Sequence, residues 1–261
     1  MFLSMLFAAH MIKNTIYLFA GPGVGEHSLM QAFSSLTYLT YLLKTNHNVT
    51  KIQPEEIKTM DWEAHAACFV MPGGADCLYQ KHLHPDGNER IKRYVETGGS
   101  YLGLGAGGYY GGSKIEFALG TDSELIRNRD LHFFPGVVRG PTLASYDYKT
   151  DSGARAAYIQ WEERVLRLYY NGGGSFVDAD KMPNISVLAN YKMEDNIQRP
   201  AVIEATPGLG KVILSGVHFE FNPELLNQDN GLPEYIIPTL KEHDSERIEF
   251  MYYIFEKLRL I

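Results

Sequence analysis

Three apolar runs in the first half of the chain each end in a glycine-rich turn, and this repeated pattern constrains the fold most strongly. Continuous apolar runs of this length are typical of parallel strands that are buried on both faces of a sheet. Between them, residues 28–43 and 89–96 carry apolar side chains at helical spacing. The resulting β-α-β-α-β order predicts an open, mostly parallel α/β sheet with helices on both faces. The predicted strands cover residues 15–20, 49–52, 68–71 and 101–104, and the turns include Gly21 to Gly25, Gly73-Gly74 and Gly105 to Gly108.

The second half of the chain has a different pattern of predicted elements. Strand-like runs follow one another at short spacing, separated by glycine-rich turns such as residues 171–174 and 207–210. This pattern predicts antiparallel hairpins added to one edge of the same sheet. Residues 246–258 predict a closing helix, with Ser245 as its N-cap. The predicted strands are residues 164–170, 186–191, 201–204 and 211–215.

No linker and no internal repeat divides the chain, so we expect one domain over residues 12–261, preceded by an extension over residues 1–11. The chain has 261 residues, of which 45% are hydrophobic and 21% charged, and this composition suits a globular protein. Its formal net charge is -7 and it has no Lys/Arg run, which argues against nucleic-acid binding.

The first ten residues are apolar, but no basic residue precedes them, so a signal peptide at residues 1–10 is the disfavoured alternative. The run is also shorter than the roughly 20 residues of a spanning helix, so we expect no membrane span. Met11 is a plausible true start. Cys68 and Cys77 have neither metal nor redox spacing and fit a reducing compartment. We therefore expect a cytoplasmic protein.

The turn after residues 101–104 has the form of a nucleophile elbow, in which a strand, a tight turn of small residues and a helix present a Ser or Cys. Here the residue at the tip is Gly105, which has no side chain. His218 and Glu220, two positions apart, match the base and the orienting carboxylate of a triad. If that segment is extended, both side chains project to the same face.

Ligands of open α/β sheets bind beyond the carboxyl ends of the strands, where the three glycine-rich turns are expected to meet. Glycine lets backbone N–H groups approach a ligand closely, so Gly74 and Ala106 are candidates for an oxyanion hole. No cofactor and no metal site is predicted. The full set of predicted oxyanion and substrate-binding residues is Gly73, Gly74, Ala106, Gly107, Asn171 and Gly172.

Several alternatives stay open for these motifs. Cys77 could supply a nucleophile from outside the elbow, although a buried structural thiol is the commoner case. Residues 103–108 match G-x-G-x-x-G, but Gly111-Gly112 interrupts the helix that a dinucleotide site requires. His82-x-His84 could bind a metal, yet no third ligand is evident nearby.

Six motifs together give the chain a family resemblance that covers almost its whole length from about Ile12. It resembles the class I glutamine amidotransferase-like superfamily. Within it, the chain is most similar to the N-terminal domain of eukaryotic biotin–protein ligases, which also occurs as stand-alone bacterial proteins. The motifs are residues 21–24, 71–76, 98–103, 133–136, 170–174 and 215–220.

The resemblance implies a flavodoxin-like sheet and a Cys-His-Glu triad. His218 and Glu220 fall on the family's His and Glu, whereas Gly105 stands where its Cys is expected. We therefore expect a non-catalytic small-molecule-binding or regulatory domain, with an amide as one candidate ligand. The alternatives are a hydrolase or amidotransferase that uses Cys77 or a water activated by His218, and an interaction subunit with a protein partner or a second copy. The Gly-Arg-Gly-Arg loop of the ligase half is absent, so biotin ligation is not predicted.

Overall fold

The computed structural model describes residues 13–195 and 197–261 of the chain. The extension predicted over residues 1–11 lies outside the described residues.

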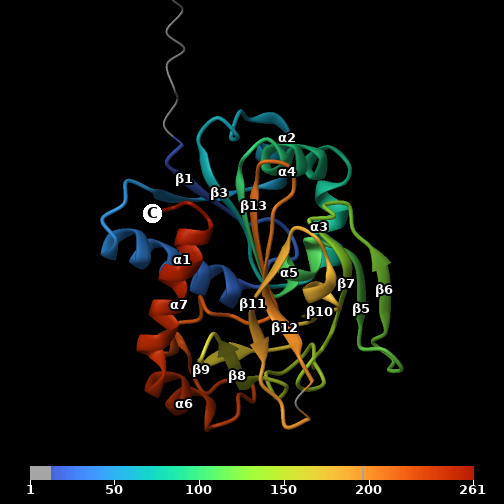
Figure 1. The fold of residues 1–261 in the computed structure, drawn as a ribbon, viewed down its shortest axis with the longest axis vertical. Helices are drawn as coiled ribbons and strands as arrows, with labels where there is room; N and C mark the ends of the chain where they lie inside the picture. Colours follow the sequence, from blue (N-terminus) through green and yellow to red (C-terminus); the bar gives the residue numbers. More distant parts are fainter. Residues whose placement is uncertain (1–12, 196) are drawn as a thin grey trace, which may run out of the picture.

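A nine-stranded sheet forms the centre of the molecule (Figure 1). The strands are hydrogen-bonded in the order β2-β1-β3-β4-β13-β12-β11-β8-β9. From β2 to β13 neighbouring strands pair in parallel, and from β13 to β9 they pair antiparallel. The predicted parallel sheet with an antiparallel extension is therefore confirmed. In chain order the strands are β1 (Thr15–Phe19), β2 (Asn48–Ile52), β3 (Ala66–Met71), β4 (Ser100–Leu104), β8 (Arg155–Trp161), β9 (Arg164–Tyr170), β11 (Ile185–Tyr191), β12 (Arg199–Ala205) and β13 (Lys211–Ser215).

Helices cover both faces of the parallel half, as Figure 1 shows. The long helices α1 and α7 pack on one face, and the shorter α2, α3, α4 and α5 pack on the other. Helix α6 lies against β8 and β9. The helices are α1 (Glu26–Leu42), α2 (Pro54–Thr59), α3 (Asp76–Leu83), α4 (Asp86–Glu96), α5 (Ala106–Tyr110), α6 (Ile236–Glu242) and α7 (Asp244–Lys257), with single 3-10 turns η1 (Ala179–Lys181) and η2 (Pro223–Leu225).

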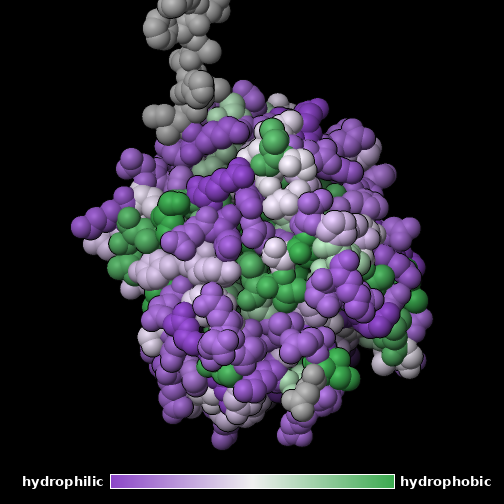
Figure 2. Space-filling view, in the orientation of Figure 1, coloured by the Kyte–Doolittle hydropathy of each residue, from purple (hydrophilic) through white to green (hydrophobic). Residues whose placement is uncertain are grey.

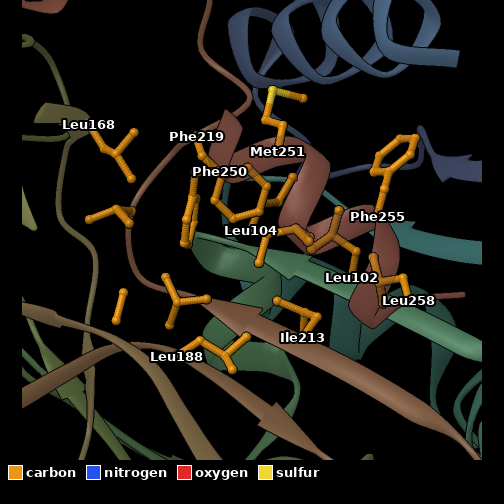
Figure 3. Packing of buried hydrophobic residues seen from close by; sticks show 14 of the residues in the cluster. Leu102, Leu104, Leu168, Leu188, Ile213, Phe219, Phe250, Met251, Phe255 and Leu258 are labelled. Carbon is orange, nitrogen blue, oxygen red and sulfur yellow. The ribbon is translucent and has the colours of Figure 1, made fainter. Parts of the chain in front are cut away.

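Strand β4 shows why this part of the chain is apolar without interruption. Leu102 and Leu104 pack into the cluster under α7, together with Phe250, whereas Tyr101 points to the opposite face and packs near α4 and α5. Figure 3 shows Leu102 and Leu104 of β4 beneath the side chains of α7. Because both faces are buried, the strand carries large apolar or aromatic side chains on both sides.

A second, four-stranded sheet was not predicted from the sequence. Its order is β10-β7-β5-β6, and it packs beside the face that carries α3 and α5. Strand β7 contains Pro135 and Gly136, two residues that ordinarily argue against a strand, so its sequence resembles a loop. The strands are β5 (Gly112–Phe117), β6 (Leu125–Asn128), β7 (Phe134–Gly140) and β10 (Ser175–Phe176).

The N-cap predicted for the closing helix is wrong. Helix α7 begins at Asp244 and its N-cap is His243, so Ser245 lies inside the first turn. The Ser245 hydroxyl donates to the carboxylate of Glu246 rather than accepting from a backbone N–H group. An acidic side chain in the first turn suits the positive end of the helix dipole.

Among the helices of the described residues, none is both long enough and apolar enough to cross a bilayer. The face seen in Figure 2 is mostly hydrophilic, with apolar side chains in separate groups.

Candidate functional site

The turn between β4 and α5 has the backbone geometry of an elbow. Gly105 is the single residue between the end of β4 at Leu104 and the start of α5 at Ala106. Its φ is 53° and its ψ is -110°. A side chain in this region of backbone space costs roughly 1–3 kcal/mol, and glycine avoids that cost. The Gly105 N–H group donates to the carbonyl of Ser215 at 2.9 Å, which ties the turn to the end of β13.

His218 and Glu220 form a buried pair just after β13. Nδ1 of His218 lies 2.6 Å from Oε1 of Glu220, and the two residues are 5% and 1% exposed. The segment is not extended as the sequence-based expectation assumed. His218 forms an isolated bridge to Tyr169, and residues 219–220 make a turn that brings both side chains together. A carboxylate in this position fixes the orientation and tautomer of the imidazole.

The imidazole of His218 points at Gly105. An ideal Cβ atom built on Gly105 would lie 2.7 Å from Nε2 and 2.6 Å from Cε1 of the His218 ring. The nitrogen that does not face Glu220 is therefore directed at the elbow tip. The ring occupies part of the space that the first atom of any side chain at residue 105 would take.

Two backbone N–H groups beside the elbow have no hydrogen-bond acceptor among the described residues. The bridge between Val24 and Gly74 uses the N–H groups of Gly25 and Ala75, which leaves the Gly74 N–H without a partner among the described residues. Ala106 is the first residue of α5, so its N–H has no intrahelical acceptor and none among the other described residues. Such groups can stabilise a ligand oxygen.

A cavity of about 240 Å³ opens beside the elbow and collects most of the predicted residues. It lies at the carboxyl ends of the parallel strands, where open α/β sheets usually bind their ligands. Glu220 lies behind His218 and does not line the cavity. The predicted residues that line it are Gly73, Gly74, Gly105, Ala106, Asn171, Gly172 and His218.

Gly107, by contrast, does not line the cavity. Its N–H group donates to the Pro72 carbonyl at 3.2 Å, and a Cβ atom on it would lie 1.9 Å from the Met71 carbonyl oxygen. Glycine is required here because α5 crosses the end of β3 with its backbone nearly in contact. The structure therefore places Gly107 in packing rather than at the ligand surface.

The turn after β9 contributes the opposite wall. A Cβ atom on Gly173 would lie 1.6 Å from the Gly216 carbonyl oxygen, so the turn and the segment before His218 touch through their backbones. The Tyr109 hydroxyl of α5 donates to the Gly172 carbonyl at 3.0 Å. These contacts hold Asn171 and Gly172 against the elbow.

Sequence reasoning missed the polar and aromatic side chains of the cavity. Ser28, in the first turn of α1, has its hydroxyl 2.8 Å from the position of a Cβ on Gly73. Asp76 and Asp151 are the carboxylates that line the cavity. Asp76 belongs to the motif at residues 71–76, but the sequence does not indicate where its side chain points. Phe117, Tyr146 and Tyr148, which we call the aromatic rim, stack edge to face beside the cavity.

Asp76 is buried against Arg129, with its Oδ2 atom 2.7 Å from Nε of that residue. Burial raises the pKa of the Asp76 carboxyl above its ordinary value, although the hydrogen bond and the charge of Arg129 oppose that shift. Asp76 lines the cavity and Arg129 does not, so the positive partner of the ion pair lies behind the cavity wall.

The other predicted candidates take different places. Cys77 is exposed and lines the cavity, whereas Cys68 is buried in β3 and burial raises the pKa of its thiol. Nδ1 of His84 pairs with Asp130 at 2.7 Å on the surface, away from the cavity. Over the part of the chain that the structure describes, no three His, Cys, Asp or Glu side chains cluster as metal ligands.

Comparison with known proteins gives one family and two relatives. The family described as "Biotin-protein ligase, N terminal" matches residues 14–261. The biotin–protein ligase of Schizosaccharomyces pombe is 32% identical over 251 residues, and the match covers 94% of this chain. This chain spans only 38% of the length of that ligase. An uncharacterized protein of Chlamydia muridarum is 35% identical over 211 residues, covering 74% of this chain and 81% of that protein.

Solved structures resemble the chain more distantly. A putative ThuA-like protein from Bacteroides uniformis has a TM-score of 0.48 at 9% identity, with 92% of this chain and 93% of that chain covered. The glutaminase domain of Trypanosoma brucei CTPS has a TM-score of 0.42 at 11% identity, with 89% and 94% covered.

Proposed function

The chain belongs to the family of biotin–protein ligase N-terminal domains, and from this premise we propose that it binds a small amide or other acyl compound without forming a covalent bond to it. The observation that carries the proposal is the assembly around Gly105. A His-Glu pair and two free N–H groups surround a residue that has no side chain.

Each part has a role in that binding. The N–H groups of Gly74 and Ala106 are suited to a carbonyl oxygen, since neither has an acceptor among the described residues and both residues line the cavity. Nε2 of His218 can exchange a hydrogen bond with a polar atom beside the elbow, while Glu220 holds the ring in place. An acyl ligand would form hydrogen bonds with these groups without a covalent reaction.

Gly105 has no side chain and cannot act as a nucleophile. The site can therefore bind an amide without forming a covalent intermediate at the elbow. Amidotransferases that this site resembles attack the amide with a thiolate from the elbow. The test is ammonia release from glutamine and a panel of primary amides, with the parent protein compared with its Gly105→Cys variant. We expect turnover from the variant alone. Turnover by the parent protein would overturn the non-catalytic assignment.

Binding itself is tested with a variant that fills the cavity. A substitution at Gly74 is unsuitable, because a Cβ there would lie 2.1 Å from the Gly23 carbonyl oxygen and would disturb the backbone. Ala106→Leu instead enlarges a side chain that already lines the cavity. We expect calorimetric binding of simple primary amides to the parent and its loss in Ala106→Leu. Equal binding by both proteins would place the ligand elsewhere.

A second candidate function rests on Cys77, whose exposed thiol lines the same cavity. In that reading the protein is a hydrolase whose nucleophile comes from α3, or whose water is activated by His218. Turnover by the parent that is lost in Cys77→Ser would support the thiol, and turnover lost only in His218→Ala would support the water.

A further inference from the structure

The charged groups of the cavity are unevenly distributed. Among the described residues that line it, the carboxylates are Asp76 and Asp151, and none is Lys or Arg. The buried Arg129 offsets Asp76 through their ion pair. The ion pairs of the described residues do not include Asp151, so its charge is uncompensated at the cavity wall.

Asp151 is fixed in place by neutral groups. Its Oδ1 accepts from Nδ2 of Asn171 at 3.0 Å, and its Oδ2 accepts from Nδ2 of Asn230 at 3.1 Å. Neutral amide donors orient the carboxylate without cancelling its charge. The remaining acceptor of Asn171, its Oδ1 atom, is buried and has no hydrogen-bond partner among the described residues.

Aromatic rings line the same cavity as Asp151. Tyr146 and Tyr148 of the aromatic rim pack edge to face with their centroids 4.9 Å apart, and Tyr169 lines the cavity as well. Burial, followed by the charge of Asp151, raises the pKa of the Tyr169 hydroxyl, and both residues line the cavity. Aromatic faces beside a carboxylate favour cations, through cation–π attraction and direct pairing.

We propose that the cavity selects ligands with a cationic group and rejects carboxylates: the acyl carbonyl lies at Gly74 and Ala106, and an ammonium group lies between Asp151 and the aromatic rim. This inference rests on the proposed acyl-binding function and specifies its ligand class. Free glutamine is a poor fit, because its α-carboxylate would meet an acidic wall with no Lys or Arg side chain to receive it.

Three probes of nearly equal size separate charge from shape, since each carries a primary amide on a short alkyl chain. The cation is δ-aminovaleramide, the neutral compound is valeramide, and the anion is glutaramate. Binding is measured by calorimetry at about pH 8, where the amine of δ-aminovaleramide is still protonated. We expect the cation to bind about fivefold more tightly than valeramide and the anion to bind weakest.

Two variants of one loop test the role of Asp151. Asp151→Asn removes the charge at the cavity, and we expect the ratio of the cation and valeramide Kd values to fall to near one. Asp147→Asn is the matched control, because Asp147 is in the same loop, bonds Lys149 and Thr150, and does not line the cavity. It should keep the preference. Unfolding curves for both variants check that each is folded.

The outcomes distinguish the two proposals. If none of the three amides binds the parent protein, the acyl-binding function fails and the charge preference fails with it. If the amides bind but glutaramate matches or exceeds δ-aminovaleramide, the cation preference alone is overturned. Retention of the preference in Asp151→Asn would overturn the assignment of that carboxylate.

Discussion

Nε2 of His218 lies 2.7 Å from the place where a Cβ atom of residue 105 would stand. This distance is shorter than the usual contact distance between non-bonded carbon and nitrogen atoms. Any side chain at residue 105 must therefore displace a buried ring that Glu220 holds in place. The relationship links the imidazole to the elbow and sets the cost of any side chain there.

Gly105→Ala is therefore expected to destabilise the protein for two reasons. The positive φ of 53° disfavours alanine by roughly 1–3 kcal/mol, and the new methyl group displaces His218. Gly120→Ala is the control, because Gly120 has φ of 75° and no atom within 4 Å of its Cβ position. Denaturant unfolding should show a larger loss of unfolding free energy at Gly105, and equal losses would mean that the His218 contact contributes nothing.

Gly105→Cys should create a reactive thiol. A thiol beside an imidazole is deprotonated more readily and is therefore alkylated faster. Iodoacetamide labelling is measured in a Cys77→Ser background, because Cys77 is the exposed thiol of the parent. We expect the added His218→Ala change to slow labelling by about tenfold. Equal rates with and without the imidazole would argue that His218 does not act on residue 105.

Gly107→Ala should cost on the order of 3 kcal/mol or prevent folding, since its Cβ would overlap the Met71 carbonyl at 1.9 Å. Gly25→Ala is a matched control on another turn of the site, where the nearest atom, the Ser28 hydroxyl, lies at 3.4 Å. It should cost less than about 1 kcal/mol. Thermal unfolding of the two variants compares them, and a mild effect at Gly107 would contradict the close approach of α5 and β3.

Arg129→Met should destabilise the protein in a pH-dependent manner. Burial already raises the pKa of Asp76 and Arg129 opposes this, so removing Arg129 raises it further. A carboxyl with a raised folded-state pKa contributes stability below its unfolded pKa and loses it as the pH rises through the folded value. The deficit should thus be smaller near about pH 4 and approach about 3–5 kcal/mol near about pH 8.

The control for that experiment is Lys241→Met, which breaks the exposed pair with Glu224. Exposed ion pairs contribute little, so its unfolding free energy should barely change at either pH. A deficit for Arg129→Met that is independent of pH would show that the loss arises from packing rather than from the charge of Asp76.

The parallel half of the sheet could be predicted because both its faces are buried. Leu102 and Tyr101 point to opposite sides of β4 and are both apolar, which leaves a continuous signal in the sequence. The small second sheet could not be predicted, since Pro135 and Gly136 give β7 the composition of a loop. Its pairing with β5 depends on contacts that no local pattern records.

The site was predictable where its chemistry depends on residue type and local spacing. Gly105, His218 and Glu220 were selected in this way, and the structure brings them together. Asp151 and the aromatic rim could not be selected, because the end of β5 and the segment after β7 meet at the cavity only in the folded chain. Whether these groups bind a ligand remains a prediction.

The position of β13 between β4 and β12 has a consequence for biosynthesis. The elbow leaves the ribosome long before the strand that holds its N–H group and delivers His218. Until β13 inserts, β4 is an unpaired apolar edge, and such edges are prone to associate with other chains. The cavity therefore stays incomplete while residues 106–215 are synthesised, and during that time the free edge of β4 is open to pairing with other chains.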